Sequence, residues 1–364
     1  MHLAHLRLRD FRNYPRLDAD FTPGFHLLLG QNAQGKTNLL EALYLLATLR
    51  SFRGVGSAQM IRLGHKGYFV GADILGPARR QVKMYWSAAE RQLSLDGQPV
   101  RKLADYLGVF RAVVFCTEDL QLIKGPGTRR RRFLDLLLAQ THASYIPLLQ
   151  RYSKALRARN ALLKHPAPDE MALESFTREL IAAGNPIIQL RRDLTPRLSA
   201  LARLAHRRIA HDAEELLIEY RPSVKQDFAV ELAQARGRER VYRSTVVGPH
   251  RDELQLALDG RPAAEYASEG QKRTLAVALK MAQAEYVTGL HGSPPVLLID
   301  DVMGELDAGR RSGLLPLLER SHQASGQVFM TCTEENWPRE LGRRLHRWEV
   351  KHGAVAQLAD TPGA

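Results

Sequence analysis

Residues 30–37, with the sequence GQNAQGKT, constrain the fold of this chain more than any other segment. They form a complete phosphate-binding loop, in which glycines let the backbone curl until its amides point at phosphate oxygens. Lys36 is expected to reach the β- and γ-phosphates of a nucleotide, and Thr37 to hold Mg²⁺. The predicted nucleotide contacts in the loop are Gly30, Gln31, Asn32, Ala33, Gln34, Gly35, Lys36 and Thr37.

The segments on either side of the loop supply the context that it requires. Phe25–Leu29 is an apolar strand that runs into the first glycine, and Thr37–Leu49 is a helix with an apolar stripe. The positive end of that helix adds to the attraction for phosphate. His2–Arg9 alternates as a strand does, and short alternating runs between residues 68 and 95 predict a small antiparallel sheet.

A second element of the site is an apolar strand that ends in two carboxylates. Val296–Ile299 runs directly into Asp300 and Asp301. A carboxylate that emerges from a buried strand beside a phosphate loop is where a Mg²⁺ ligand belongs, and we assign that role to Asp300. Asp301 is the candidate general base that polarises the attacking water, so Lys36 and Asp301 are the predicted catalytic residues.

A third element is the start of a long helix expected over Gln271–Val287. A serine, a glycine and the free amides of a helix start make a second anion site, with Ser268, Gly270 and Gln271 as candidate contacts. Ser268 precedes Asp300 by 32 residues, a gap that fits one helix, a turn and the carboxylate strand. This order is that of ABC ATPases, in which residues 305–307 would form the loop that crosses a dimer interface.

The middle of the chain has a different character. Residues 129–220 are dominated by helix formers and basic side chains, and prolines such as Pro186 and Pro196 are expected to divide them into several helices. Strand-like patterns return at 240–247 and 253–258. The predicted fold class is α/β, an ABC-ATPase head (a mixed sheet with the phosphate loop) that carries an inserted all-helical arm. The predicted domains are a first ATPase lobe at 1–124, the arm at 125–239 and the remainder of the head at 240–364.

The charge of the chain points to a polyanionic partner. It carries 52 Lys and Arg against 39 Asp and Glu, a net charge of +13, which favours nucleic acid. Arginines recur at 129–132 and along the arm at positions such as Arg191 and Arg208, where aromatic residues are sparse. This pattern favours recognition of charge and shape over base stacking. For His250 two readings stay open, a DNA contact or the closing of a turn.

Cysteine usage and hydropathy bear on location. Cys116 and Cys332 stand far apart and in no metal-ligand spacing, which fits a reducing compartment. The N-terminus does not read as a signal peptide, and no apolar run approaches the length of a membrane span. We therefore expect a cytoplasmic protein without a membrane partner.

Several segments are too long and too distinctive to be generic nucleotide-binding sequence. They are FRNY (11–14), GKTNLLEALYLLATLRSFR (35–53), TEDLQLIKG (117–125), RRFLD (131–135), VGPHRD (247–252), SEGQKRT (268–274) and IDDVMGELD (299–307). Together they make the chain, over essentially its whole length, resemble the RecF family of bacterial recombination-mediator ATPases, which is related to the SMC and RecN proteins.

The resemblance implies an ATP- and Mg²⁺-dependent switch that acts on DNA. It implies a homodimer formed with ATP, each nucleotide being held between the loop of one subunit and residues 268–271 of the other. Arg12 and Asn13 would lie near the nucleotide. It further implies a weak, DNA-stimulated ATPase that binds gapped DNA and junctions between single and double strands. Its partners would be RecR and RecO, with which it helps to load the RecA recombinase, and it would support replication restart and the SOS response.

Some positions depart from the general ABC pattern. Asp301 stands where these ATPases carry Glu, a feature shared with RecF-like proteins, and the shorter side chain fits a slow ATPase. Gly304 replaces the usual serine of the dimer-crossing loop. Thr331 or Thr333 would substitute for a missing histidine, and Glu118 lies near the place of the lobe-linking glutamine, without an assigned role.

Two other classes of function compete with this interpretation. The first is the nucleotide-binding subunit of a membrane transporter, but Lys36 and Asp300 are 264 residues apart, which leaves room for an arm that such subunits lack. The second is a small-molecule kinase or a GTPase. In such an enzyme the helix start at Ser268 has no task, and the chain has no guanine-reading Asn-Lys-x-Asp segment.

Overall fold

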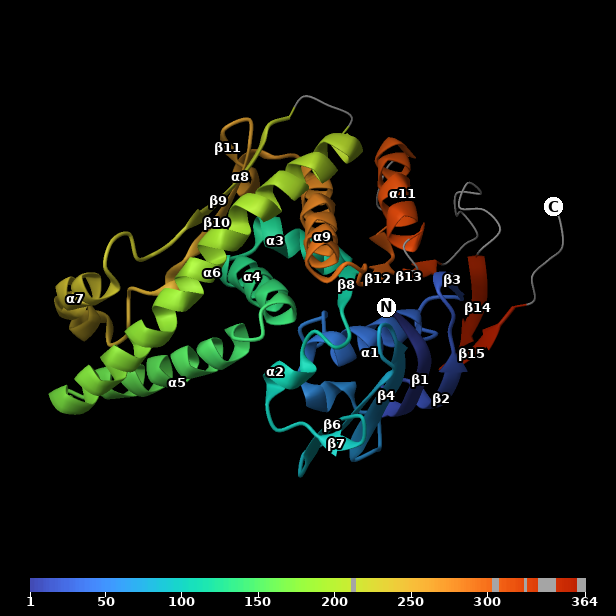
Figure 1. The fold of residues 1–364 in the computed structure, drawn as a ribbon, viewed down its shortest axis with the longest axis horizontal. Coiled ribbons are helices and arrows are strands. Elements are labelled where there is room, and N and C mark those ends of the chain that lie inside the picture. Colours follow the sequence, from blue (N-terminus) through green and yellow to red (C-terminus); the bar gives the residue numbers. More distant parts are fainter. Residues whose placement is uncertain (211–213, 303–307, 324–325, 333–344, 359–364) are drawn as a thin grey trace.

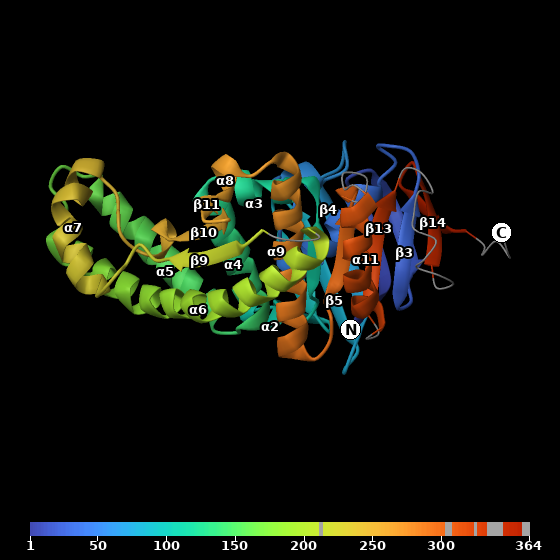
Figure 2. The same ribbon diagram turned by 90° about the horizontal axis from the view of Figure 1, so that it is seen from above.

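The computed structural model describes residues 1–210, 214–302, 308–323, 326–332 and 345–358. Within them, an α/β head carries a projection of long helices, so that the molecule is elongated (Figures 1 and 2). The strands are β1 (His2–Phe11), β2 (Tyr14–Asp20), β3 (Gly24–Leu29), β4 (Gly67–Leu75), β5 (Arg80–Ser87), β6 (Arg91–Leu95), β7 (Gln98–Pro99), β8 (Ala112–Phe115), β9 (Leu216–Arg221), β10 (Glu253–Leu258), β11 (Arg261–Pro262), β12 (Val296–Asp300), β13 (Gln327–Cys332), β14 (Leu345–Lys351) and β15 (Ala354–Gln357). The α-helices are α1 (Lys36–Thr48), α2 (Leu103–Tyr106), α3 (Gln121–Lys124), α4 (Gly127–Thr141), α5 (Tyr145–Leu163), α6 (Glu170–Ala210), α7 (Phe228–Tyr242), α8 (Ala263–Tyr266), α9 (Glu269–His291) and α11 (Ala308–Gln323).

Helix α1 is the centre of the head, because it lies between two sheets. One sheet has the order β15-β14-β3-β13-β12-β8 and is parallel from β14 to β8, and the other is the antiparallel sheet β2-β1-β4-β5-β6-β7. Leu43 of α1 belongs to the same buried cluster as Leu8 of β1, Val70 of β4 and Leu298 of β12. A helix that is apolar on nearly every side is held by packing on every side, so α1 has a fixed position relative to both sheets. The antiparallel sheet that the sequence predicts is confirmed.

The opposite face of the parallel sheet is covered by helices. Phe25 of β3 and Val113 of β8 pack in one cluster with Ile209 of α6, Met281 of α9 and Leu318 of α11. The long α6 therefore reaches from the projecting arm back onto the head, and α9, expected at 271–287, is confirmed over a slightly longer range. No helix in the described ranges is both long enough and apolar enough to cross a bilayer.

The prediction that prolines divide the arm into separate helices is wrong for α6. Pro186 and Pro196 both lie inside this single helix of 41 residues. A proline inside a helix costs about 3 kcal/mol because it removes a hydrogen bond and crowds the preceding turn. Burial of side chains such as Ile187, Leu194 and Leu198 at helical spacing against α5 and α9 offsets that cost.

Two further segments differ from the sequence-based expectation. Residues 240–247, expected as a strand, contain the end of helix α7, which the Asp227 carboxylate caps by accepting from the Val230 amide at 2.9 Å. Leu232, Ala235 and Glu239 of α7 are buried at helical spacing. The arm region also contributes a strand, β9, which pairs with β10 over Leu216–Arg221. In both cases contacts with distant elements outweigh the local pattern.

A buried ion pair joins the helices of the arm. Arg159 of α5 donates to both carboxylate oxygens of Glu239 of α7 at 2.8 and 2.6 Å, and both side chains are about 1% exposed. The same guanidinium donates to the hydroxyls of Thr177 at 3.0 Å and Thr245 at 2.8 Å. Its polar partners among the described residues come from the arm and the segment after α7, so this network fixes their packing.

We expect Glu239→Ala to lower the free energy of unfolding by about 3–5 kcal/mol, because it leaves the Arg159 guanidinium buried without a counter-charge. Guanidinium chloride titration followed by circular dichroism measures this change. Arg236→Ala is the matched control, because Arg236 lies on the same helix as Glu239 and forms exposed ion pairs with Glu170 and Glu174. This variant should change the free energy of unfolding by less than about 1 kcal/mol. Equal effects of the two variants would contradict the assignment.

Candidate nucleotide-binding site

The loop between β3 and α1 has a backbone that only glycine permits at two positions. Gly30 and Gly35 have φ values of +152° and +122°. A Cβ on Gly30 would lie 2.3 Å from the carbonyl oxygen of Val350 in β14, and one on Gly35 would lie 2.7 Å from Nδ2 of Asn13. Neighbouring elements therefore lie in close contact with the loop on two sides and hold its curled conformation.

Hydrogen bonds from those neighbours hold several loop carbonyls. The Asn13 amide donates to the carbonyl of Gln34 at 2.8 Å, and the Tyr14 hydroxyl donates to the carbonyl of Gly35 at 3.0 Å. The side-chain oxygen of Gln34 accepts from the amide of His352 at 2.8 Å. No side chain among the described residues caps the first turn of α1. The uncapped helix start and the curled loop fit the phosphates of a nucleotide.

Lys36 lies over the loop that precedes it. Its ammonium donates to the carbonyl oxygens of Gly30 at 2.5 Å and Gln31 at 2.9 Å, and the residue is buried. Burial lowers the pKa of the Lys36 ammonium, whereas the nearby carboxylates of Asp301 and Asp300 act in the opposite direction. An ammonium has three donors, so Lys36 can bridge the loop backbone and a phosphate oxygen.

The predicted Mg²⁺ ligands meet at one edge of the parallel sheet. The Thr37 hydroxyl donates to Oδ1 of Asp300 at 2.8 Å, and the Thr331 hydroxyl of β13 donates to the same oxygen at 3.0 Å. Burial raises the pKa of the Asp300 carboxyl, while these two hydrogen bonds oppose the rise and the charges of Glu118 and Asp301 add to it. A hydroxyl and a carboxylate beside a phosphate loop are ligands that suit Mg²⁺, which would neutralise phosphate charge when bound.

Asp301 has an unusual backbone for a residue with a side chain. Its φ is +57°, in the left-handed region, and its amide donates to the Thr331 hydroxyl at 3.0 Å. Such conformations are held only where the surroundings impose them, and they cluster at functional sites. Thr331 therefore contacts both carboxylate residues. Of the other positions that depart from the ABC pattern, Gly304 and Thr333 lie outside the described residues, as does the expected dimer-crossing segment 305–307.

Ser268 and Gln271 form the start of α9 as a reciprocal cap. The Ser268 hydroxyl accepts from the amide of Gln271 at 3.2 Å, and the side chain of Gln271 accepts from the amide of Ser268 at 2.6 Å. The Gln271 side-chain amide also donates to Glu214 at 2.7 Å. Both views place α8, which immediately precedes Ser268, well away from β3 at the loop (Figures 1 and 2). Within one chain, the helix start that contains Gly270 and the phosphate loop thus occupy separate places.

Arg12 lies beside α1, where it makes a contact that the sequence did not indicate. Its Nε and Nη2 donate to the two carboxylate oxygens of Glu41 at 2.7 and 2.8 Å, and its Nη1 donates to the carbonyl of Gln59 at 2.8 Å. Glu41 is fully buried and also accepts from the Ser51 hydroxyl. A glutamate within an otherwise apolar helix is the signal that could have revealed this network. It holds Arg12, while Asn13 lies directly on the loop.

Arg191 and His250, both singled out in the sequence, make contacts within the protein. Arg191 is 2% exposed and is paired with Asp135 at 2.7 Å and Asp252 at 2.9 Å, so it is not available to a phosphate backbone. His250 donates through Nε2 to the carbonyl of Thr245 at 3.1 Å, and its Nδ1 is 2.5 Å from the Tyr152 hydroxyl. Burial lowers the pKa of His250 to about 4, so it is neutral at pH 7 and closes the turn.

Comparison with known proteins gives consistent matches over the whole chain. The family model described as the RecF/RecN/SMC N terminal domain matches residues 2–354. A protein of Symbiobacterium thermophilum named DNA replication and repair protein RecF is 38% identical, and the match covers 98% of each chain. A protein of the same name from Lactococcus lactis is 36% identical and is matched over 98% of this chain and 99% of its own length.

Solved structures agree with the sequence relatives. A structure of the recombination mediator protein RecF in the RecFOR pathway, named RecF-ATP, has a TM-score of 0.88 at 29% identity over 98% of this chain and 99% of the other. The corresponding RecF-ATPrS structure has a TM-score of 0.87 at 30% identity over 98% of each chain. An Smc head domain from Pyrococcus furiosus shares the fold, with a TM-score of 0.57 at 15% identity over 98% of this chain and 96% of the other.

We expect Lys36→Arg to weaken the binding of ATP by about tenfold or more, because a planar guanidinium cannot take the place of an ammonium between two loop carbonyls. Isothermal titration calorimetry with ATP and Mg²⁺ measures the affinity. Lys66→Arg, which makes the same change at an exposed position, is the control and should bind as the unmodified protein does. Unchanged affinity in Lys36→Arg would remove this side chain from the site.

Proposed function

The chain belongs to the RecF/RecN/SMC family, and from that membership we propose that it is an ATP-dependent DNA-binding protein of recombinational repair and replication restart. The observation that carries this proposal is the pair of half-sites in one subunit. The loop with Thr37, Asp300 and Thr331 forms one half, and the capped helix start at Ser268 forms the other. Relatives of nearly the same length are named DNA replication and repair protein RecF.

We assign the residues of the two half-sites as follows. ATP binds with its phosphates on residues 30–37, near Asn13 and, farther out, Arg12, and Mg²⁺ is held by Thr37 and Asp300. Ser268, Gly270 and Gln271 of a second copy complete each site, so that ATP binding drives formation of a homodimer. Asp301 polarises the attacking water as general base. Its side chain is shorter than glutamate and reaches less far, which fits a weak, DNA-stimulated ATPase in which ATP serves mainly as a switch.

Gapped DNA and junctions of single and double strands are the DNA partners that we propose. The net charge of +13 supports contact with phosphates. On α6, the arginines at 192, 197, 203, 207 and 208 are exposed. The arm therefore presents positively charged side chains to solvent, where a phosphate backbone can reach them. The protein partners are RecR and RecO, with which the chain helps to load RecA and supports the SOS response. It works in the cytoplasm.

The transporter alternative has no comparable support. The family match extends over residues 2–354 and so includes the helical arm, which a transporter subunit does not require. The decisive experiment measures binding to gapped, single-stranded and duplex DNA with ATP, with ADP and without nucleotide, while light scattering records molecular mass. ATP-dependent dimers that prefer gapped DNA are the expected result. DNA binding that is the same with ATP, with ADP and without nucleotide would overturn the proposal.

We expect Ser268→Arg to bind ATP normally yet to remain monomeric, because the substituted helix start meets the nucleotide only in the partner subunit. Light scattering with ATP and Mg²⁺ gives the mass, and calorimetry gives the affinity. The control Ala89→Arg adds the same charge to an exposed hairpin and should still dimerise. An ATP-dependent dimer of Ser268→Arg would refute the shared site.

We also expect the affinity for gapped DNA to fall steeply with salt. Each phosphate contact releases counterions, so the logarithm of the binding constant should fall linearly with the logarithm of salt concentration, by about 0.7–0.9 per contact. Fluorescence anisotropy between about 50 and 200 mM salt measures this slope. A slope near zero would exclude the electrostatic mode of recognition.

A further inference from the structure

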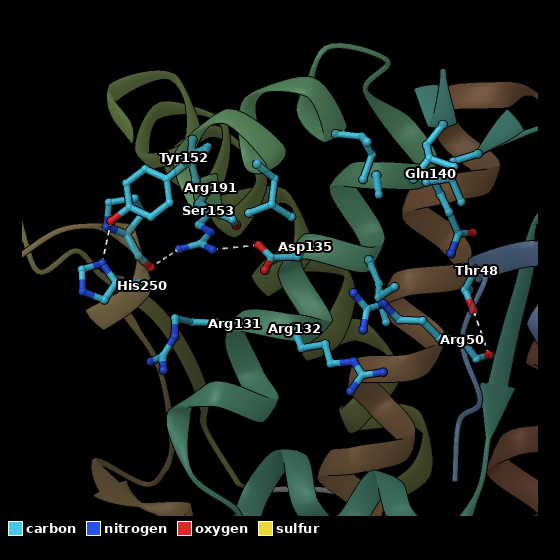
Figure 3. A pocket seen from close by; sticks show the side chains of 18 of the residues that line it. Thr48, Arg50, Arg131, Arg132, Asp135, Gln140, Tyr152, Ser153, Arg191 and His250 are labelled. Carbon is cyan, nitrogen blue, oxygen red and sulfur yellow. Dashed lines mark hydrogen bonds and ion pairs between the residues drawn. The ribbon is translucent and has the colours of Figure 1, made fainter. Parts of the chain in front are cut away.

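A cavity of about 670 Å³ lies between the head and the arm, away from the nucleotide half-sites. The end of α1, helix α2, helices α4, α5 and α6, and the turn at Pro249 and His250 line it (Figure 3). None of its lining residues belongs to the loop 30–37 or to the helix start 268–271. A cavity of this volume is in the range that holds a small ligand or a few side chains of another chain.

Part of the wall of this cavity is apolar and open to solvent. Leu103 of α2 is 37% exposed, and Leu107, Leu136 and Leu149 are half-buried. These side chains come from three different elements and face a common space. An apolar concave surface of this kind favours an apolar occupant, because burial of both surfaces removes them from water.

Another part of the wall is positively charged. Arg50 and Arg132 both line the cavity, and Arg129 lies close to Arg132. Burial lowers the pKa of the Arg132 guanidinium, and the charges of Arg50 and Arg129 lower it further. In the part of the chain that the structure describes, no carboxylate forms an ion pair with any of the three. Arg132 is half-buried, whereas Arg50 and Arg129 are exposed. Three like charges close together favour an anion that would offset their repulsion.

Two buried polar groups in the lining have no partner of their own. Gln140 is 4% exposed, and its side-chain oxygen accepts no hydrogen bond from any described residue. Nε of Arg191 is likewise without an acceptor there, although the rest of that guanidinium is paired. Figure 3 places Gln140 toward Thr48 and Arg50, and Arg191 toward Tyr152 and Asp135. A buried acceptor and a buried donor without partners are costly, and both atoms are enclosed by the protein rather than open to the cavity.

From this combination we propose that the cavity is a docking site for a short acidic peptide segment of a protein partner, with leucine or phenylalanine side chains between its carboxylates. Its carboxylates would pair with Arg50 and Arg132, and its apolar side chains would pack on Leu103 and Leu149. The site rests on observations separate from ATP and DNA binding.

DNA matches the lining less well than a peptide does. A sugar–phosphate backbone is mainly charged and polar and offers little apolar surface to fill the apolar wall, and unpaired bases bind best on aromatic platforms. The aromatic rings of the lining are those of Tyr152, which is 3% exposed, and His250, and the two side chains are hydrogen-bonded to each other. The mixture of leucines and arginines therefore favours a protein segment, and DNA becomes an outcome that the experiment can reveal.

The test uses the full-length protein and fluorescein-labelled synthetic peptides in which Asp or Glu alternates with Leu or Phe, measured as a pool by fluorescence anisotropy. We expect micromolar affinity, with a loss of about tenfold in Arg50→Glu and in Leu103→Ser. Arg157→Glu is the matched charge control, because Arg157 is exposed on α5 and does not line the cavity. Leu63→Ser, at a residue that is 98% exposed, is the matched apolar control.

The possible outcomes separate the alternatives. Peptides in which Lys replaces Asp and Glu, or Ser replaces Leu and Phe, should each bind at least about tenfold more weakly than the parent pool. No binding of the parent pool at millimolar concentration overturns the proposal, and so does equal loss in Arg157→Glu. If Arg50→Glu weakens gapped-DNA binding while the peptide pool does not bind, the cavity is a DNA contact instead. Nucleotide affinity should stay unchanged in every variant, which separates this result from a failure of the ATP-binding proposal.

Discussion

The hydrogen bond from Thr37 to Asp300 joins residues 263 positions apart, and the chemistry of the head depends on it. It exists because β13 lies between β3 and β12 in one parallel sheet, so that the ends of these three strands meet at one edge. Thr331 at the end of β13 completes the contact. Carboxyl ends of parallel strands are the usual position for ligand sites in α/β sheets, because loops and helix starts converge there.

Helix α1 turns that edge into a rigid site. Its first residues belong to the phosphate loop, and its apolar side chains are buried between two sheets, so the end of the loop that joins α1 is anchored to the core of the head. Glu41 adds a polar constraint, because it is buried and holds Arg12 and Ser51 at the side of α1. Any signal from a nucleotide must therefore pass through packed elements that have little freedom to deform gradually.

The arm shows how a basic chain distributes its arginines between structure and recognition. Arg159 and Arg191 are buried and paired with carboxylates, and they hold helices together. Others on α6 are exposed, and a third group near Arg132 faces the cavity without carboxylate partners among the described residues. The net charge of the chain does not distinguish these three groups of arginines. Only their burial and pairing separate cations that stabilise the fold from those that remain for a partner.

The sequence by itself determined the phosphate loop, the carboxylate strand and the capped helix at Ser268, together with their order. These are local patterns, in which each residue type is required by the backbone or by the chemistry at that position. The tertiary structure alone decided that α6 continues through Pro186 and Pro196, that residues up to Tyr242 are helical, and that Arg191 is unavailable to a ligand. It also selected Thr331 as the third contact of the site and brought Arg12 to Glu41. Each of these outcomes depends on burial against elements distant in the chain, and burial is a property of the packed molecule that a local pattern does not contain.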